Sequence, residues 1–136
     1  MRSIELSQKN PYYIPKERYY ELKHFCFQYN DWLKALAVLN GWSTSNDIWL
    51  AGIVKNNCPA SQTERIAIAR SYYAKRIELI NKCLEEIQPA IAPFIIKGVT
   101  DGLSYDILAA QGCPCCREYY YGEYRKFFWQ LSIERN

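Results

Sequence analysis

Apolar residues recur at three- and four-residue steps through the first 40 residues, the spacing of one face of an α-helix. Asn30 and Asp31 interrupt this stripe, and their short side chains suit the N-cap of a second helix, although a single helix running through them fits as well. The N-terminal third is therefore predicted to be helical. Its apolar stripe consists of Leu22, Phe25, Cys26, Tyr29, Leu33, Leu36 and Leu39.

A long helix is predicted after a connector, residues 41–60, that is rich in Gly, Ser, Asn and Pro. Ser61 and Glu64 have the spacing of a capping box, and Pro89 ends the helix. Its apolar stripe is close to a heptad repeat. We favour covering of this stripe by the N-terminal helices of the same chain, but a homodimer seam stays open. The seam residues would be Ile66, Tyr73, Ile77, Ile80 and Leu84.

Three further helices are predicted in the remaining residues. A short one covers 89–100 and stops at Asp101-Gly102, since glycine accepts the left-handed conformation. Ser104 then begins a helix that ends before Gly112, with Leu103, Ile107 and Leu108 on its inner side.

The last helix is predicted over 117–133, after a turn formed by residues 113–116. A short helix, a tight turn and a long helix make up a helix-turn-helix. The buried stripe of the long helix is expected to contain Tyr120, Tyr124, Phe127, Phe128 and Leu131.

Length and composition indicate one small all-α domain of about five or six helices. The 136 residues are 49% hydrophobic and 15% aromatic, which favours an ordered chain. Residues 1–60 are expected to form an aromatic helical region with its connector. Residues 61–136 are expected to hold the long helix and the helix-turn-helix, packed as one compact unit.

The chain is expected in the cytoplasm of a bacterial cell. Its longest apolar stretch, 90–99, contains Pro93 and Lys97 and is far shorter than the ~20 residues of a membrane span. Residues 1–10 do not resemble a secretory signal, so we expect the six cysteines to be free thiols.

The net charge of +3 does not gather on the predicted helix-turn-helix. Residues 104–136 contain four basic and four acidic groups, and the excess lies in residues 1–103. Charge alone therefore does not indicate nucleic acid.

A helix-turn-helix that docks in the usual way presents the start of its second helix to base edges in the major groove of double-stranded DNA. This placement predicts DNA contacts by Arg117, Glu118, Tyr121 and Arg125, with Arg117 the best candidate for reading guanine. Tyr105 and Lys126 are expected to contact phosphates.

Three segments resemble phage transcriptional activators of the ArpU and RinA types: T-E-R at 63–65, G-L-S-Y-D-I-L at 102–108 and R-E-Y-Y-Y-G-E-Y-R-K-F at 117–127. The resemblance covers roughly residues 61–133. It implies a late-gene regulator of a phage or prophage in Gram-positive bacteria, with a helix-turn-helix similar to region 4 of sigma factors. It also makes RNA polymerase a further candidate partner.

A phage structural or packaging adaptor, built from the same helices without DNA reading, is the alternative. No enzymatic activity, cofactor or metal is predicted. His24 is the only histidine, and no Gly-rich phosphate loop or nucleophile elbow is present. Adjacent cysteines, as in Cys113, Cys115 and Cys116, do not easily share one tetrahedral ion.

Overall fold

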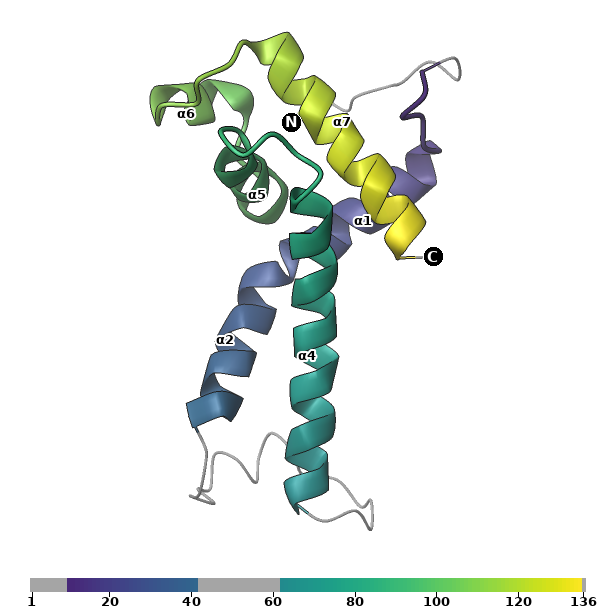
Figure 1. Cartoon of the computed structure of the whole chain (residues 1–136), viewed down its shortest axis with the longest axis vertical. Helices are drawn as coiled ribbons and strands as arrows, with labels where there is room; N and C mark the ends of the chain where they lie inside the picture. The colour runs from purple at the N-terminus through teal and green to yellow at the C-terminus, as the bar shows by residue number, and fades with distance from the viewer. Residues whose placement is uncertain (1–9, 42–61, 136) are drawn as a thin grey trace. The chain divides into compact units, whose positions relative to one another are not determined.

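The computed structural model describes residues 10–41 and 62–135, and in these ranges it contains helices and no strands. The predicted all-α fold class is thus confirmed (Figure 1). The helices are α1 (Lys16–Phe27), α2 (Tyr29–Gly41), α4 (Gln62–Leu84), α5 (Ala92–Asp101), α6 (Tyr105–Ala110) and α7 (Arg117–Glu134).

The N-terminal stripe belongs to two helices rather than one. α1 ends at Phe27, and the Gln28 N–H donates to the Phe25 carbonyl at 3.3 Å, a bond of the tighter 3₁₀ type. α2 begins at Tyr29, one residue before the Asn30-Asp31 pair. The predicted connector and Ser61 of the capping box lie outside the described residues.

The long helix α4 stops earlier than its sequence pattern predicts. It ends at Leu84, and Ile87 lies in a bend where its N–H donates to the Leu84 carbonyl at 3.0 Å. The chain thus leaves the helix before Pro89, which would have clashed with a continuing helical turn. α5 follows with Pro93 in its first turn and ends at Gly102, whose φ is +70°.

The chain divides into two compact units, and the boundary does not fall at residue 60. One unit comprises residues 1–29 and 79–136, and the other comprises residues 30–78. We call them the outer-chain unit and the mid-chain unit. The division cuts through α2 and α4, so the outer-chain unit is formed by two segments that are far apart in the sequence.

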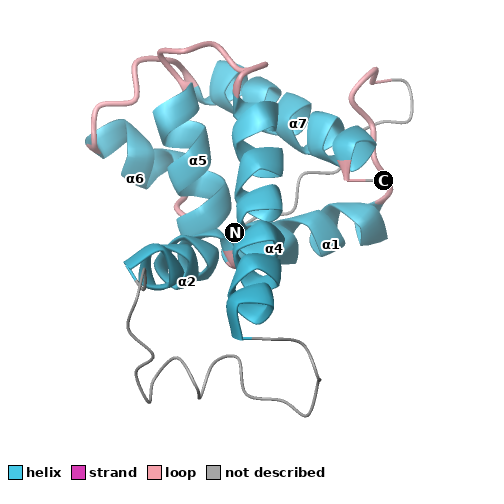
Figure 2. Ribbon diagram, turned by 60° about the horizontal axis from the view of Figure 1, so that its bottom comes forward, coloured by secondary structure: helices cyan, strands magenta, loops and turns pink. Residues whose placement is uncertain are grey.

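α1, α5, α6 and α7 belong to the outer-chain unit (Figure 2). Their buried side chains form an aromatic core. α1 packs against α5 and α7, and α5 also packs against α6. The Tyr19 and Tyr124 hydroxyls lie 3.0 Å apart inside this core, and the Tyr19 ring meets Phe128 edge to face at 5.1 Å. Arg18 of α1 closes the far end by donating to the Ser132 carbonyl at 3.0 Å.

The mid-chain unit is built on a contact between α2 and α4. Leu39 is fully buried, and Ile66, Ala69 and Tyr73 pack against it. Arg70 donates to the Leu39 carbonyl at 2.7 Å. Leu39 is buried as predicted, but Trp32 is buried in place of Leu33, which is 39% exposed.

These contacts bear on the residues predicted for a dimer seam. Ile66 and Tyr73 touch Leu39 of their own chain, Ile77 and Ile80 are buried, and Leu84 is half-buried. Ile66 and Tyr73 thus have the contacts expected if the N-terminal helices of the same chain cover the stripe. A homodimer stays a prediction.

Candidate nucleic-acid interface

The segment from α6 to α7 contains a short helix, a turn and a long helix, as predicted. α6 starts after Ser104, although the serine side chain makes no capping hydrogen bond. Gly112, with φ +104°, ends the helix. The Cys113 N–H donates to the Leu108 carbonyl and the Gly112 N–H to the Ala109 carbonyl, both at 3.0 Å. This pair of bonds is a Schellman motif, which satisfies the last carbonyls of α6.

The connection between α6 and α7 lies where the sequence predicts it. It runs over residues 111–116, whereas a helix-turn-helix turn has about three or four residues. The Schellman motif takes up its first residues, and Pro114 keeps the next ones out of helical geometry. The Tyr105 hydroxyl donates to the Cys115 carbonyl at 2.6 Å and so ties the connection back to α6.

The inner side of α7 matches its prediction in full. Tyr120, Tyr124, Phe127, Phe128 and Leu131 are all buried. On α6, Leu108 is buried but Ile107 is 47% exposed, so the prediction that both face the core was wrong for Ile107. A helix of six residues offers one buried position here, and adjacent residues of a helix point about 100° apart.

Three of the predicted DNA-binding residues gather beside α6. Arg117 forms an ion pair with Asp106 at 2.5 Å, and its guanidinium lies 5.5 Å from the centre of the Tyr105 ring. The Tyr105 N–H donates to the Tyr121 hydroxyl at 3.4 Å. Arg117 is therefore paired within the chain. The pair is open to solvent, with side-chain exposures of 59% and 74%, and is accordingly weak.

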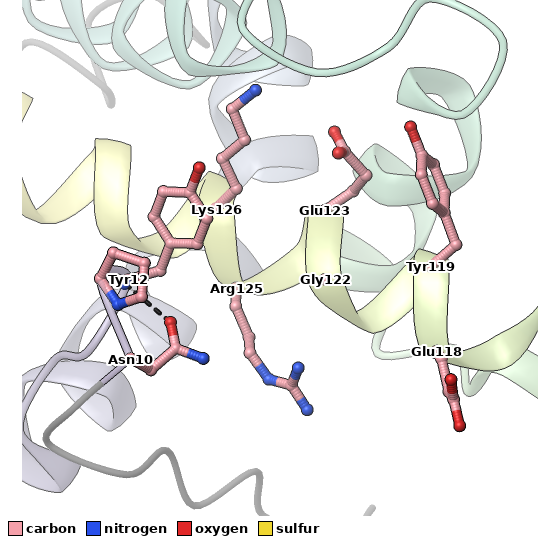
Figure 3. Close-up of a pocket in the computed structure, with 9 residues that line it drawn as sticks. Asn10, Tyr12, Glu118, Tyr119, Gly122, Glu123, Arg125 and Lys126 are labelled. Atoms are coloured by element: carbon pink, nitrogen blue, oxygen red, sulfur yellow. Dashed lines mark hydrogen bonds between the residues drawn. The ribbon is translucent and has the colours of Figure 1, made fainter.

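The other three predicted residues, Glu118, Arg125 and Lys126, line a hollow of about 410 Å³ on the outward side of α7 (Figure 3). Arg125 and Glu118 point to one side of the helix in this view, and Lys126 points to the other. The predicted residues thus form two groups rather than one surface. The rest of the lining consists of Asn10, Pro11, Tyr12, Tyr119, Gly122 and Glu123.

Gly122 is the one glycine inside α7, and no neighbouring side chain or backbone requires a glycine at this position. A Cβ built at this position meets no atom within 4 Å, and the backbone does not have a positive φ. Glycine in a helix interior costs about 1 kcal/mol relative to alanine. The position therefore carries a local cost that no contact in the described residues repays.

The N-terminal segment beside this hollow was missed by sequence reasoning. Asn10 accepts a hydrogen bond from the Tyr12 N–H at 2.8 Å, and the Tyr12 ring meets Trp129 of α7 at 5.4 Å. Pro11 and Pro15 bracket this aromatic segment and are its one sequence signal. More than 100 residues separate it from α7, so no local pattern could have paired the two.

The charges around the hollow balance. Its lining contains two basic residues, Arg125 and Lys126, and two acidic ones, Glu118 and Glu123. The Nε of Arg125 is buried without a hydrogen-bond partner, which leaves a donor on this side of the helix unused.

Residues 10–41 and 62–135 contain neither a metal-binding cluster nor a membrane-spanning helix. No cluster of three or more His, Cys, Asp or Glu side chains in these ranges is arranged to hold a metal ion. Their helices also lack the combination of length and apolar character that a membrane span requires.

Comparison of the chain with protein-family models, curated proteins and solved structures found no match in any of the three. The likeness to phage activators therefore rests on the three short segments alone.

Proposed function

We propose that the protein binds double-stranded DNA through the first half of α7 and acts as a phage or prophage transcription regulator. The observation that carries the DNA-binding proposal is Gly122, which sits with open space above it between Glu118 and Arg125. A glycine on an exposed helix face lets a second backbone approach more closely than any other residue. The regulator role rests on the resemblance to phage activators.

The cations near this face are available to a polyanion. Arg125 and Lys126 both line the hollow beside Gly122. Arg117 would have to leave Asp106, but an exposed ion pair contributes only about 0–1 kcal/mol. A bidentate arginine–guanine contact favours the right base over a wrong one by about 1–3 kcal/mol, which exceeds what the pair with Asp106 contributes.

The first test is salt-dependent binding. Sequences are selected from a random pool of 40-bp duplexes, and the Kd of the best duplex is measured by fluorescence anisotropy at several salt concentrations. We expect the logarithm of the affinity to fall linearly with the logarithm of salt concentration, because phosphate contacts release counterions. Absence of salt-dependent binding would overturn the proposal.

The second test is Gly122→Ala. The methyl group fits inside the isolated chain and should raise the free energy of unfolding by up to about 1 kcal/mol. It would hold a duplex away from the helix, and we expect at least a tenfold weaker Kd. Stability and affinity thus change in opposite directions, which excludes misfolding as the cause.

Gly41→Ala is the matched control. Gly41 closes α2 and also has no atom within 4 Å of a built Cβ, but it lies in the mid-chain unit. This variant should leave DNA affinity unchanged. Equal affinities for Gly122→Ala and the wild type would show that the outward side of α7 is not the interface.

A structural or packaging adaptor is the second candidate, and the balanced charge of the hollow favours it. α4 also exposes Ile68 and Tyr72, the kind of apolar surface that protein partners cover. This candidate predicts self-association in sedimentation velocity together with no salt-dependent affinity for duplex DNA.

A further inference from the structure

The sulfur atoms of Cys113 and Cys115 lie 3.7 Å apart in the connection between α6 and α7. Both thiols are partly exposed, whereas Cys26 and Cys83 are buried in the core. A disulfide bond is about 2.0 Å long, so the two sulfurs need to approach by less than about 2 Å. Rotation of the side chains supplies most of such a movement.

The backbone on both sides of this pair is anchored. The Cys113 N–H is held by the Leu108 carbonyl at 3.0 Å, and the Cys115 carbonyl accepts from the Tyr105 hydroxyl at 2.6 Å. Pro114 fixes φ between the two cysteines. The fold therefore keeps the two thiols as neighbours, which an unfolded chain does only part of the time.

The thiols are also accessible to reagents. A hollow of about 400 Å³ is lined by Pro114, Cys115 and Cys116 on one side, and by Ile91 and Tyr119 among its other residues. A small thiol or disulfide compound reaches Cys115 from there without unfolding of the core.

We propose that Cys113 and Cys115 form a reversible modification site, which a low-molecular-weight disulfide such as oxidised glutathione closes into an intrachain disulfide. One cysteine, as its thiolate, attacks the reagent, forms a mixed disulfide and releases one glutathione thiolate. The other cysteine then loses its proton, attacks the first cysteine's sulfur and expels the second glutathione. Two cysteine thiols are oxidised, and one oxidised glutathione is reduced to two thiols.

The site should open as readily as it closes. Its ring spans only three residues, and strained or exposed disulfides are the easily reduced ones. Burial, followed by the hydrogen bond with Cys113, raises the pKa of Cys115 to about 11, so little of it is thiolate at neutral pH. The exchange is accordingly best followed at pH 8.5.

The experiment is differential alkylation after incubation of the full chain with defined ratios of oxidised and reduced glutathione. Free thiols are blocked with N-ethylmaleimide, disulfides are reduced, and the new thiols are labelled with iodoacetamide. Trypsin places all three cysteines of the turn in one peptide, residues 98–117. We expect maleimide on Cys116 and acetamide labels on Cys113 and Cys115, located by fragment masses.

Three serine variants and an unfolded control complete the test. Cys116→Ser should still close the ring, whereas Cys113→Ser and Cys115→Ser should stop at a mixed disulfide. In 8 M urea the equilibrium constant for closure should be at least tenfold smaller than in buffer. Pairing of Cys115 with Cys116, mixed disulfides alone in the wild type, or equal constants with and without urea would each overturn the proposal. None of these readouts depends on DNA binding.

Discussion

The two sides of α7 contrast in almost every property. The inner side is a run of aromatic rings and leucine, fully enclosed, with Phe127 and Leu131 at zero exposure. The outward side has a glycine at its centre, with charged residues of both signs and open space around it. The inner side can hold the helix in place without help from the outer one. Stability and the proposed binding are thus separable on a single helix.

The contrast also explains why an 18-residue helix tolerates Gly122. Enclosed aromatic side chains contribute several kcal/mol, far more than the ~1 kcal/mol cost of an interior glycine. Because tertiary packing stabilises the helix, its outward positions do not need residues of high helix propensity.

The largest expected effect comes from truncating the inner side. Phe127→Ala should lower the free energy of unfolding by about 3–5 kcal/mol, because it removes a ring with no exposed surface and leaves a cavity. Lys126→Ala, on the outward side, should change it by no more than about 0.5 kcal/mol. Urea denaturation measures both, and similar losses would break the comparison. Should Phe127→Ala not fold, Phe127→Leu gives a smaller loss in the same direction.

Alkaline pH is expected to give the next largest loss of stability, because it ionises two buried tyrosines of α7 and the buried Cys83 of α4. Burial raises the pKa of Tyr124 and Tyr120 above 10.0 and the pKa of Cys83 to about 12. The folded state therefore retains protons that the unfolded state releases. The contribution of these groups to the free energy of unfolding is fully present below about pH 9. It decreases above about pH 9 for the cysteine and above about pH 10 for the tyrosines. Each group contributes up to about 1.4 kcal/mol per pH unit.

Urea denaturation between pH 8 and 11 tests this prediction. Tyr124→Phe should flatten the decline above pH 10, since it removes one of the groups that resist ionisation. A pH-independent stability in the wild type would contradict the burial of these side chains.

A close contact on the inner side gives a third effect. The Tyr120 hydroxyl occupies the space where a Cβ at Gly98 would lie, and this hydroxyl has no hydrogen-bond partner. Gly98→Ala should cost about 1–3 kcal/mol through overpacking. Tyr120→Phe should be close to neutral, because it removes an unsatisfied polar atom.

The double variant sharpens this result. Gly98→Ala combined with Tyr120→Phe should cost less than the sum of the two single changes, with a coupling energy of at least about 0.5 kcal/mol. Additive costs, measured by urea denaturation, would show that the hydroxyl does not fill the space next to Gly98.

A small stability effect is expected at the solvent-facing pair between Asp106 of α6 and Arg117 of α7. Asp106→Asn should lower stability by no more than about 1 kcal/mol, since both partners of the pair with Arg117 are exposed. The same change removes a negative charge and frees Arg117, so DNA affinity should rise, by up to about fivefold, the equivalent of about 1 kcal/mol. Weaker binding would place Asp106 itself in the interface.

Local patterns predicted the elements that are fixed by local chemistry. Gly112 and the aromatic periodicity located α7 and its buried stripe, because a left-handed residue and a 3.6-residue repeat are properties of short segments. The predicted end of α4 was wrong because the chain leaves the helix ahead of Pro89. The choice of Leu33 over Trp32 was wrong because adjacent apolar residues offer the pattern two near-equal solutions.

The candidate site was predictable only as a list of residues. The position of a residue along α7 predicts its exposure but not its partners. The sequence therefore did not indicate that Asp106 pairs with Arg117. The placement of Asn10 and Tyr12 beside α7 is a tertiary contact with no local signal. Sequence therefore supplied the residues of the candidate interface, and three-dimensional packing divided them into two groups.

The contacts between α1 and α7 join residues that the ribosome makes far apart in time. Arg18 and Ser132 are separated by 114 positions, and Tyr19 and Tyr124 by 105. Newly made α1 therefore emerges with Leu22 and Phe25 uncovered, and its α7 partner leaves the ribosome much later. Contacts of such long range slow folding, since the loop between them must close first. A chain truncated before α7 would leave this apolar surface open to chaperones and proteases.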